Sequence, residues 1–216
     1  MKTRLLLLTV IACAAVLPAA SLRPVSFDAR VAMELTSPGG GGDYYRLGAG
    51  FDAGATVRLP LVRSLYFEPG LFFTYSAMTA QELVTFDDEY YFEGAANMYG
   101  LRVPFNFGYT FNLTDNVAMD VFTGPWLNIN LSARQKLLPN FSAPQPLPDR
   151  KINLFEHGWR RADAQWGFGL SFTFAQSYYI GITGGVGFTP LAKFGNKDKK
   201  VRIHRNTVAI SLGYKF

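Results

Sequence analysis

The sequence predicts an all-β protein, an eight-stranded antiparallel up-and-down transmembrane β-barrel, and three observations carry this prediction. Eight segments alternate apolar residues with small or polar ones, which is the period of two expected for strands. The chain is 49% hydrophobic and 15% aromatic, yet no apolar run after residue 20 reaches the ~18 residues of a membrane-spanning helix. The last segment, 205–216, ends on an aromatic carboxy-terminus, as the last strands of bacterial outer-membrane barrels do.

The amino-terminal residues predict export. Residues 1–20 combine a basic start, an apolar run and small residues at the end, which is the pattern of a secretory signal peptide. We expect cleavage near Ala20, which leaves residues 21–216 as one outer-membrane β-barrel domain in the cell outer membrane. The single cysteine, Cys13, is expected to leave with the peptide. The alternative is a lipoprotein cleavage box that leaves a lipidated Cys13.

The alternation divides the rest of the chain into eight strands. In the last of them Val208, Ile210 and Leu212 alternate with small residues. Each segment has the ~9–11 residues that a tilted strand needs to cross a bilayer. The expected strands are 27–36, 45–60, 65–77, 99–111, 117–132, 162–174, 178–190 and 205–216.

The polar face of these strands separates a membrane barrel from a soluble one. A soluble sandwich or lipocalin-like barrel also alternates, but it buries its apolar face. Here the other face carries ten charges beside many glycines, so it could not fill an apolar core. A soluble barrel turned inside out would bury all ten charges or expose the Phe and Leu side chains. We therefore expect apolar side chains to face lipid and the polar face to line the interior. Its charged members are Asp28, Arg30, Glu34, Asp52, Arg58, Glu68, Arg102, Asp120, Asp163 and Lys215.

The connections alternate in length and predict the topology. Short turns at 61–64, 112–116 and 175–177 are expected in the periplasm, and long loops outside the cell. The external loops are expected at 37–44, 78–98, 133–161 and 191–204.

Aromatic residues at outward positions near both strand ends predict the interfacial girdles of a membrane barrel. We expect Tyr214 and Phe216 to serve as the signal that the barrel-assembly machinery reads. The girdle residues are Tyr45, Tyr75, Tyr99 and Phe188 on the loop side, and Phe27, Phe111, Phe174, Tyr178, Tyr214 and Phe216 on the turn side.

Three prolines, Pro69, Pro104 and Pro125, fall inside expected strands of a sheet that has no edge. Each removes a donor from the hydrogen-bond ladder. We expect bulges or local loss of pairing at these positions.

The interior is expected to hold an ionic network. Eight strands enclose a space that side chains fill, so an open porin channel is not expected. Unpaired buried charges are costly, which favours a satisfied network over the alternative, a narrow ion or proton path. Asp28 and Lys215 are expected to pair across the seam, and Arg58 to face Glu68 if the turn is centred on Arg63. Arg46, Arg161 and Arg205 add charge near the outer rim. The network residues are Asp28, Arg30, Arg58, Glu68, Arg102, Asp120 and Lys215.

The external loops differ in charge, since the second is acidic and the fourth is basic. We expect a solvated surface whose basic loop meets outer-membrane lipids and lipopolysaccharide; a docking surface for a protein partner is the alternative. No basic-aromatic tract suited to nucleic acid appears, and the net charge is only +5.

Signals for catalysis are weak. His157, Asp163 and Ser132 would meet only through an unusual loop fold, so a loop-sited lipid-modifying enzyme or protease is the alternative to a non-enzymatic barrel. No metal-ligand spacing, phosphate loop or nucleotide fingerprint appears. We therefore expect no catalytic residue, metal or cofactor.

Four segments carry a family resemblance: residues 101–109 (LRVPFNFGY), 123–129 (TGPWLNI), 165–170 (QWGFGL) and 213–216 (GYKF). In these features the chain resembles the PorT-like outer-membrane barrel domains of Gram-negative bacteria, often labelled porin-like. The resemblance implies the barrel fold and the outer-membrane location and, through the named member of the family, a link to secretion. It implies no catalytic residue.

Overall fold

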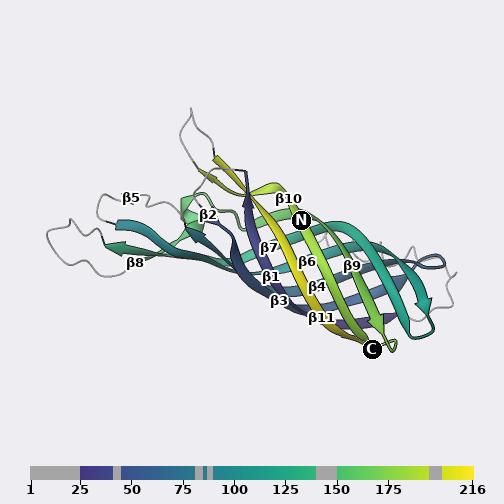
Figure 1. Cartoon of the computed structure of the whole chain (residues 1–216). Helices are drawn as coiled ribbons and strands as arrows, with labels where there is room; N and C mark the ends of the chain where they lie inside the picture. The colour runs from purple at the N-terminus through teal and green to yellow at the C-terminus, as the bar shows by residue number, and fades with distance from the viewer. Residues whose placement is uncertain (1–24, 41–44, 81–84, 87–89, 140–149, 195–200) are drawn as a thin grey trace.

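The computed structural model describes residues 25–40, 45–80, 85–86, 90–139, 150–194 and 201–216, and these form a closed antiparallel barrel (Figure 1). The wall runs in the order β4-β3-β1-β11-β10-β9-β7-β6, and β6 pairs with β4 to complete the ring. The predicted eight-stranded fold is therefore confirmed. The wall strands are β1 Ser26–Gly39, β3 Gly48–Pro60, β4 Leu65–Ala80, β6 Tyr90–Thr114, β7 Val117–Pro139, β9 Ala162–Phe174, β10 Tyr178–Phe194 and β11 Val201–Lys215. Within the described ranges, no helix has the length and apolar content to cross a membrane.

One end of the barrel carries the short turns and the other carries longer extensions, and we call these the turn end and the loop end. At the loop end several wall strands run beyond the expected strand limits, and β6 and β7 project far from the ring (Figure 1). The regions expected to be external loops are thus partly β-structure. Four short elements lie there: β2 Tyr45–Arg46, β5 Thr85–Phe86, β8 Arg150–Asn153 and the 3₁₀-helix η2 Leu154–His157.

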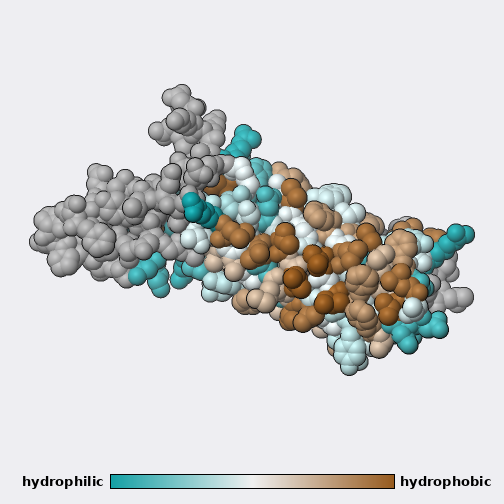
Figure 2. Space-filling view, viewed as in Figure 1, coloured by the Kyte–Doolittle hydropathy of each residue, from teal (hydrophilic) through white to brown (hydrophobic). Residues whose placement is uncertain are grey.

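The side chains face as the alternation predicts. Phe105 and Leu170 are 38% and 40% exposed on the outside of the ring, whereas Asp52 and Asp120 are 5% and 0% exposed inside it. The space-filling view shows the apolar residues as a band across the visible face of the barrel, with hydrophilic residues toward both ends (Figure 2). Because a closed sheet in lipid pairs its own backbone groups, this band is the surface suited to acyl chains.

The register at the seam also follows the prediction. Asp28 lies opposite Lys215 across the β1–β11 pair, and the amide of Phe216 donates to the carbonyl of Phe27 at 2.8 Å. The turn between β3 and β4 centres on Arg63, whose φ is 53°.

The prolines interrupt the ladder without shifting it. Pro69 of β4 pairs with Phe105, and Pro104 of β6 pairs with Trp126; beyond each, the next paired residues keep the same register after a short gap. Pro125 keeps its position opposite β9. Local loss of pairing is therefore present beside Pro69 and Pro104, whereas the β6–β7 register shifts fall elsewhere.

The prediction for one girdle residue, Tyr45, is wrong. Tyr45 does not face lipid: its hydroxyl donates to Gln135 at 2.8 Å and its ring meets Trp159 edge-on at 5.5 Å between centroids. The chain breaks from β2 to β3 at Leu47, so the alternation expected from Gly48 onward does not extend back to Tyr45.

The turn between β9 and β10 places two ordinary residues in the left-handed region, with φ of 47° at Ala175 and 60° at Gln176. This conformation costs most residues about 1–2 kcal/mol, and Asn-Gly is the pair that hairpins favour there. Ala175→Asn combined with Gln176→Gly should raise the free energy of unfolding by about 1 kcal/mol. Urea titration of the barrel in lipid vesicles, read by gel mobility, measures it. Asn116→Gly, at a turn without positive φ, is the control and should bring no gain; an equal gain there would contradict the explanation.

Candidate functional site

Five buried charges form a chain of ion pairs in the turn half of the barrel, which we call the lower ionic chain. Arg30 Nη2 lies 2.5 Å from Asp28 Oδ2, and Arg30 Nη1 lies 2.8 Å from Glu68 Oε1. Arg58 Nε donates to Glu68 Oε2 at 3.0 Å. The two terminal nitrogens of Arg58 donate to both oxygens of Asp120 at 3.1 and 3.0 Å. All five residues are at most 8% exposed, so each charge depends on its neighbours for compensation.

Aromatic rings cover the two arginines of this chain. The guanidinium of Arg30 lies 4.2 Å from the ring centre of Tyr179, and that of Arg58 lies 4.0 Å from the ring centre of Tyr66. Both contacts are within cation–π range and gain strength where water is excluded. The Tyr66 ring lies directly over Gly108, where an added Cβ would come within 2.3 Å of the Tyr66 hydroxyl oxygen. Glycine at that position therefore allows the ring to cover Arg58.

A second set of charges lies nearer the loop end, and we call it the upper ionic group: Glu34, Asp52, Arg102, Asp163 and Arg205. Arg102 Nη1 lies 2.7 Å from Glu34 Oε2 and 2.5 Å from Asp52 Oδ2. Arg205 Nη2 lies 3.2 Å from Asp163 Oδ2. Amide side chains complete the set, because Arg102 Nε donates to Asn128 and Asn128 donates to Asp163, each at 3.0 Å.

Trp126 packs beside the upper ionic group. Its ring centre lies 5.2 Å from the Arg102 guanidinium, and its Nε1 donates to Asn106 at 2.8 Å. A Cβ at Gly167 would fall 1.9 Å from the indole, so only glycine leaves room for it. These rings fill the interior, as the small diameter of an eight-stranded barrel requires.

The predicted site residues fall into three places. Asp28, Arg30, Arg58, Glu68 and Asp120 meet in the lower ionic chain, and Arg58 faces Glu68 as the turn geometry implied. Arg102 belongs instead to the upper ionic group.

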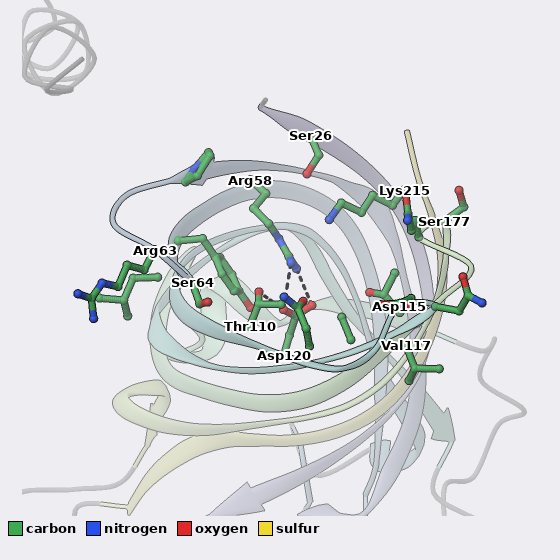
Figure 3. Close-up of a pocket in the computed structure, with 18 of the residues that line it drawn as sticks. Ser26, Arg58, Arg63, Ser64, Thr110, Asp115, Val117, Asp120, Ser177 and Lys215 are labelled. Atoms are coloured by element: carbon green, nitrogen blue, oxygen red, sulfur yellow. Dashed lines mark hydrogen bonds and ion pairs between the residues drawn. The ribbon is translucent and has the colours of Figure 1, made fainter. Parts of the chain in front are cut away.

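Lys215 faces Asp28 in the backbone register, but among the described residues its ammonium makes no ion pair within 4 Å. It lines a turn-end pocket of about 770 Å³, where Figure 3 shows its side chain projecting inward and Arg58 directed at Asp120. Lys215 and Asp28 are therefore partners in the backbone register across the seam, but the predicted ion pair between their side chains is not formed.

Arg205 was expected at the outer rim and is instead 1% exposed inside the wall. The reason is that β11 begins at Val201, so the strand already forms the wall when it reaches Arg205. Arg46 and Arg161 are exposed, as expected of rim residues, and Arg161 lies 4.4 Å from the ring centre of Phe155. The inward face of the expected strands already held Glu34, Asp52 and Asp163. Their similar depths along the tilted strands are the signal that could have grouped them.

An apolar cluster closes the interior at the loop end, and we call it the loop-end cluster. Residues 158–160 bridge β10 in the main chain: the Arg160 amide donates to Leu191 at 2.8 Å, and the Lys193 amide donates to Gly158 at 3.0 Å. This pairing holds Trp159, 4% exposed, over the mouth. The sequence analysis assigned these residues to loops and did not predict the cluster. Its buried members are Met78, Ala96, Met98, Ala133, Ile152, Leu154, Trp159, Leu191, Ala192 and Ile203.

The family described as outer membrane protein beta-barrel domain matches residues 25–190. The chain belongs to this family. No curated protein matches the sequence. Similar solved structures include Ail, the attachment invasion locus protein of Yersinia pestis, at 12% identity and a TM-score of 0.45, covering 90% of this chain and 100% of that one. The N-terminal β-barrel domain of Pseudomonas aeruginosa OprF has 10% identity and a TM-score of 0.34, covering 88% and 97%.

In this outer-membrane barrel two of the residues considered for catalysis, Asp163 and Ser132, make structural contacts. Asp163 is 2% exposed, and its carboxylate accepts from Asn128 and Asn130 and pairs with Arg205. Ser132 pairs with Tyr99 in the ladder. Asp163 thus belongs to the interior network. In the part of the chain that the structure describes, no three His, Cys, Asp or Glu side chains group as a metal site requires.

Removing the central arginine of the lower ionic chain should destabilise the outer-membrane barrel strongly. Arg58→Met leaves Glu68 and Asp120 buried without their shared partner, and breaking such a pair costs about 3–5 kcal/mol. Loss of heat resistance on unboiled gels and the urea midpoint in vesicles measure it. Arg46→Met, at an exposed position, should change little. Adding Glu68→Gln and Asp120→Asn to Arg58→Met should restore much of the loss; no recovery would show that packing, and not charge, sets the cost.

Truncating Trp159 should open the loop-end cluster. Trp159→Ala removes a buried ring, a change that costs about 3–5 kcal/mol in a packed core. Hydrogen exchange at the amides of Arg160 and Lys193 should speed up, because the ring holds their segment in place. Phe188→Ala, on the lipid face, is the matched control and should leave those amides protected. Unchanged exchange in Trp159→Ala would mean that the main-chain bridge stands without the ring.

Proposed function

We propose that this barrel holds anionic groups of lipopolysaccharide at its loop end through a rim of exposed basic side chains, which we call the basic rim. The observation that carries the proposal is the charge at this end. Among the loop-end residues whose exposure is described, Glu156 is the one exposed acid. The exposed bases are Arg46, Arg134, Lys136, Arg150, Lys151, Arg160, Arg161, Lys193 and Arg202.

Strand register places like charges of this rim directly opposite each other. Lys136 of β7 faces Lys151 of β8, and Lys193 of β10 faces Arg202 of β11. Like charges opposite each other destabilise a strand pair, and an anion between them relieves the repulsion. In the β6–β7 ladder the Cα partner of Lys136 is Glu93.

The basic rim also has a suitable position. It follows the apolar band along the barrel, where the wall leaves the lipid-facing zone (Figure 2). A basic residue near an anionic membrane surface contributes about 1 kcal/mol, and the effect fades within a Debye length. Phosphate groups of a lipopolysaccharide leaflet would lie within that reach.

We further infer that the barrel neither catalyses a reaction nor conducts ions. The filled interior, the loop-end cluster and the engaged carboxylate of Asp163 support this. A role in secretion rests on the resemblance to PorT-like barrels alone, and recognition by the assembly machinery rests on Tyr214 and Phe216, which are 43% and 74% exposed at the turn end.

A protein partner at the external loops also stays a proposal from the sequence. Several loop residues behind that prediction lie outside the described residues. They are the charged residues Glu82, Asp87, Asp88, Glu89, Lys197, Lys199 and Lys200, together with three prolines of the expected third external loop, Pro144, Pro146 and Pro148.

Charge reversal at the rim tests the lipopolysaccharide proposal. Lys151→Glu with Arg202→Glu should weaken binding of solubilised barrel to lipopolysaccharide-containing vesicles by tenfold or more, since each lost base accounts for about 1 kcal/mol. Lys151→Arg with Arg202→Lys keeps the charges and should bind as the parent does. Added salt should shrink the difference. Equal binding of all three proteins, or equal binding to neutral phosphatidylcholine vesicles, would contradict the proposal.

A further inference from the structure

A small cavity of about 50 Å³ lies between the two sets of interior charges. Its lining includes Arg30 of the lower ionic chain and Asp52 and Arg102 of the upper ionic group, together with Thr56 and Tyr179. All five residues are at most 7% exposed. Toward the loop end the loop-end cluster covers this part of the interior. The cavity shares no lining residue with the turn-end pocket, whose lining includes Arg58 and Tyr66.

Each of these five residues brings a buried polar atom that makes no hydrogen bond to any described protein atom. The atoms are Arg30 Nε, Asp52 Oδ1, Thr56 Oγ1, Arg102 Nη2 and Tyr179 OH. A buried polar group without a partner costs about 1–3 kcal/mol, and native proteins leave few of them. Five residues that each carry such an atom line one cavity, which favours a bound polar species there.

The charges and the hydrogen-bonding atoms of the lining indicate which polar species the cavity binds. Arg30 and Arg102 can only donate, and their positive charges repel a cation. Asp52 Oδ1 accepts, and its negative charge repels an anion such as chloride, which has no proton to donate to it. Water both donates and accepts and carries no charge, so it satisfies both kinds of atom. The volume is sufficient as well, because one water needs about 10–15 Å³ of such space.

We propose that this cavity is a water-binding site whose ordered molecules, about three by volume, bridge Arg30, Asp52 and Arg102. No direct hydrogen bond or ion pair joins the lower ionic chain to the upper ionic group in the described residues. The bound water joins them into one network along the barrel axis. This inference concerns the interior and does not depend on the basic rim.

A high-resolution crystal structure of the barrel, grown with bromide in place of chloride, tests the site directly. We expect ordered density peaks within hydrogen-bond distance of Asp52 Oδ1 and at least one arginine nitrogen, without anomalous signal. An anomalous peak would show that an anion occupies the cavity and overturn the proposal. Density without peaks, or direct bonds between Asp52 Oδ1 and an arginine that close the cavity, would overturn it too.

Two variants extend the test. Thr56→Val keeps the shape and removes one hydroxyl, so the peak beside it should disappear while the peaks between Asp52 and the arginines remain. Ala32→Leu places a larger side chain in the cavity lining; it should displace the water and lower the urea midpoint. Ala55→Leu, on the exposed face of β3, is the control. If Ala32→Leu and Ala55→Leu have the same midpoint, the water contributes nothing and the proposal fails.

Discussion

The constraint on which this structure depends is closure of the sheet. In lipid an unpaired backbone amide or carbonyl costs several kcal/mol, so a spanning sheet must have no free edge. Pairing of β1 with β11 and of β4 with β6 meets that demand. Closure also fixes which face of each strand is enclosed, and a ring of eight strands encloses only enough space for side chains. The apolar band outside and the charges inside are therefore two results of one geometry.

The enclosed charges show how a narrow interior compensates buried arginines. Each of Arg30, Arg58 and Arg102 lies between carboxylates on one side and an aromatic ring on another. The carboxylates compensate the charge, and the ring excludes water while still attracting the cation. Each arginine, with its carboxylates and its aromatic ring, both balances charge and fills the cross-section of the barrel. A network of small acids and lysines would not fill that space. Around these three arginines the interior is therefore packed by polar and aromatic side chains.

The sequence was sufficient for the parts of the fold where lipid imposes the alternation. The limits of β9, 162–174, agree with the prediction because the alternation of apolar and polar residues continues along the whole strand, and the turn at 61–64 lies between two such strands. Beyond the lipid this rule ends. Met78, Met98 and Ile203 point inward although they are apolar, so a search for polar inward positions assigned their segments to loops. The upper ionic group was missed for another reason: Glu34, Asp52 and Asp163 lie far apart in the chain, and only the strand tilt brings them to one depth.

Near the loop end, the inward side chains of two wall strands change from polar to apolar. On β4 the inward position changes from Ser76 to Met78 within two residues, and on β11 from Arg205 to Ile203. Toward the turn end from this level, the wall carries apolar side chains outside and charged ones inside. Toward the loop end, the inward side chains are apolar, as in the core of a soluble protein. On these two strands the change falls where the outward positions become Thr79 and Arg202, which are exposed. The side chains that fill the barrel thus change character along its axis together with those on the outer surface of the wall.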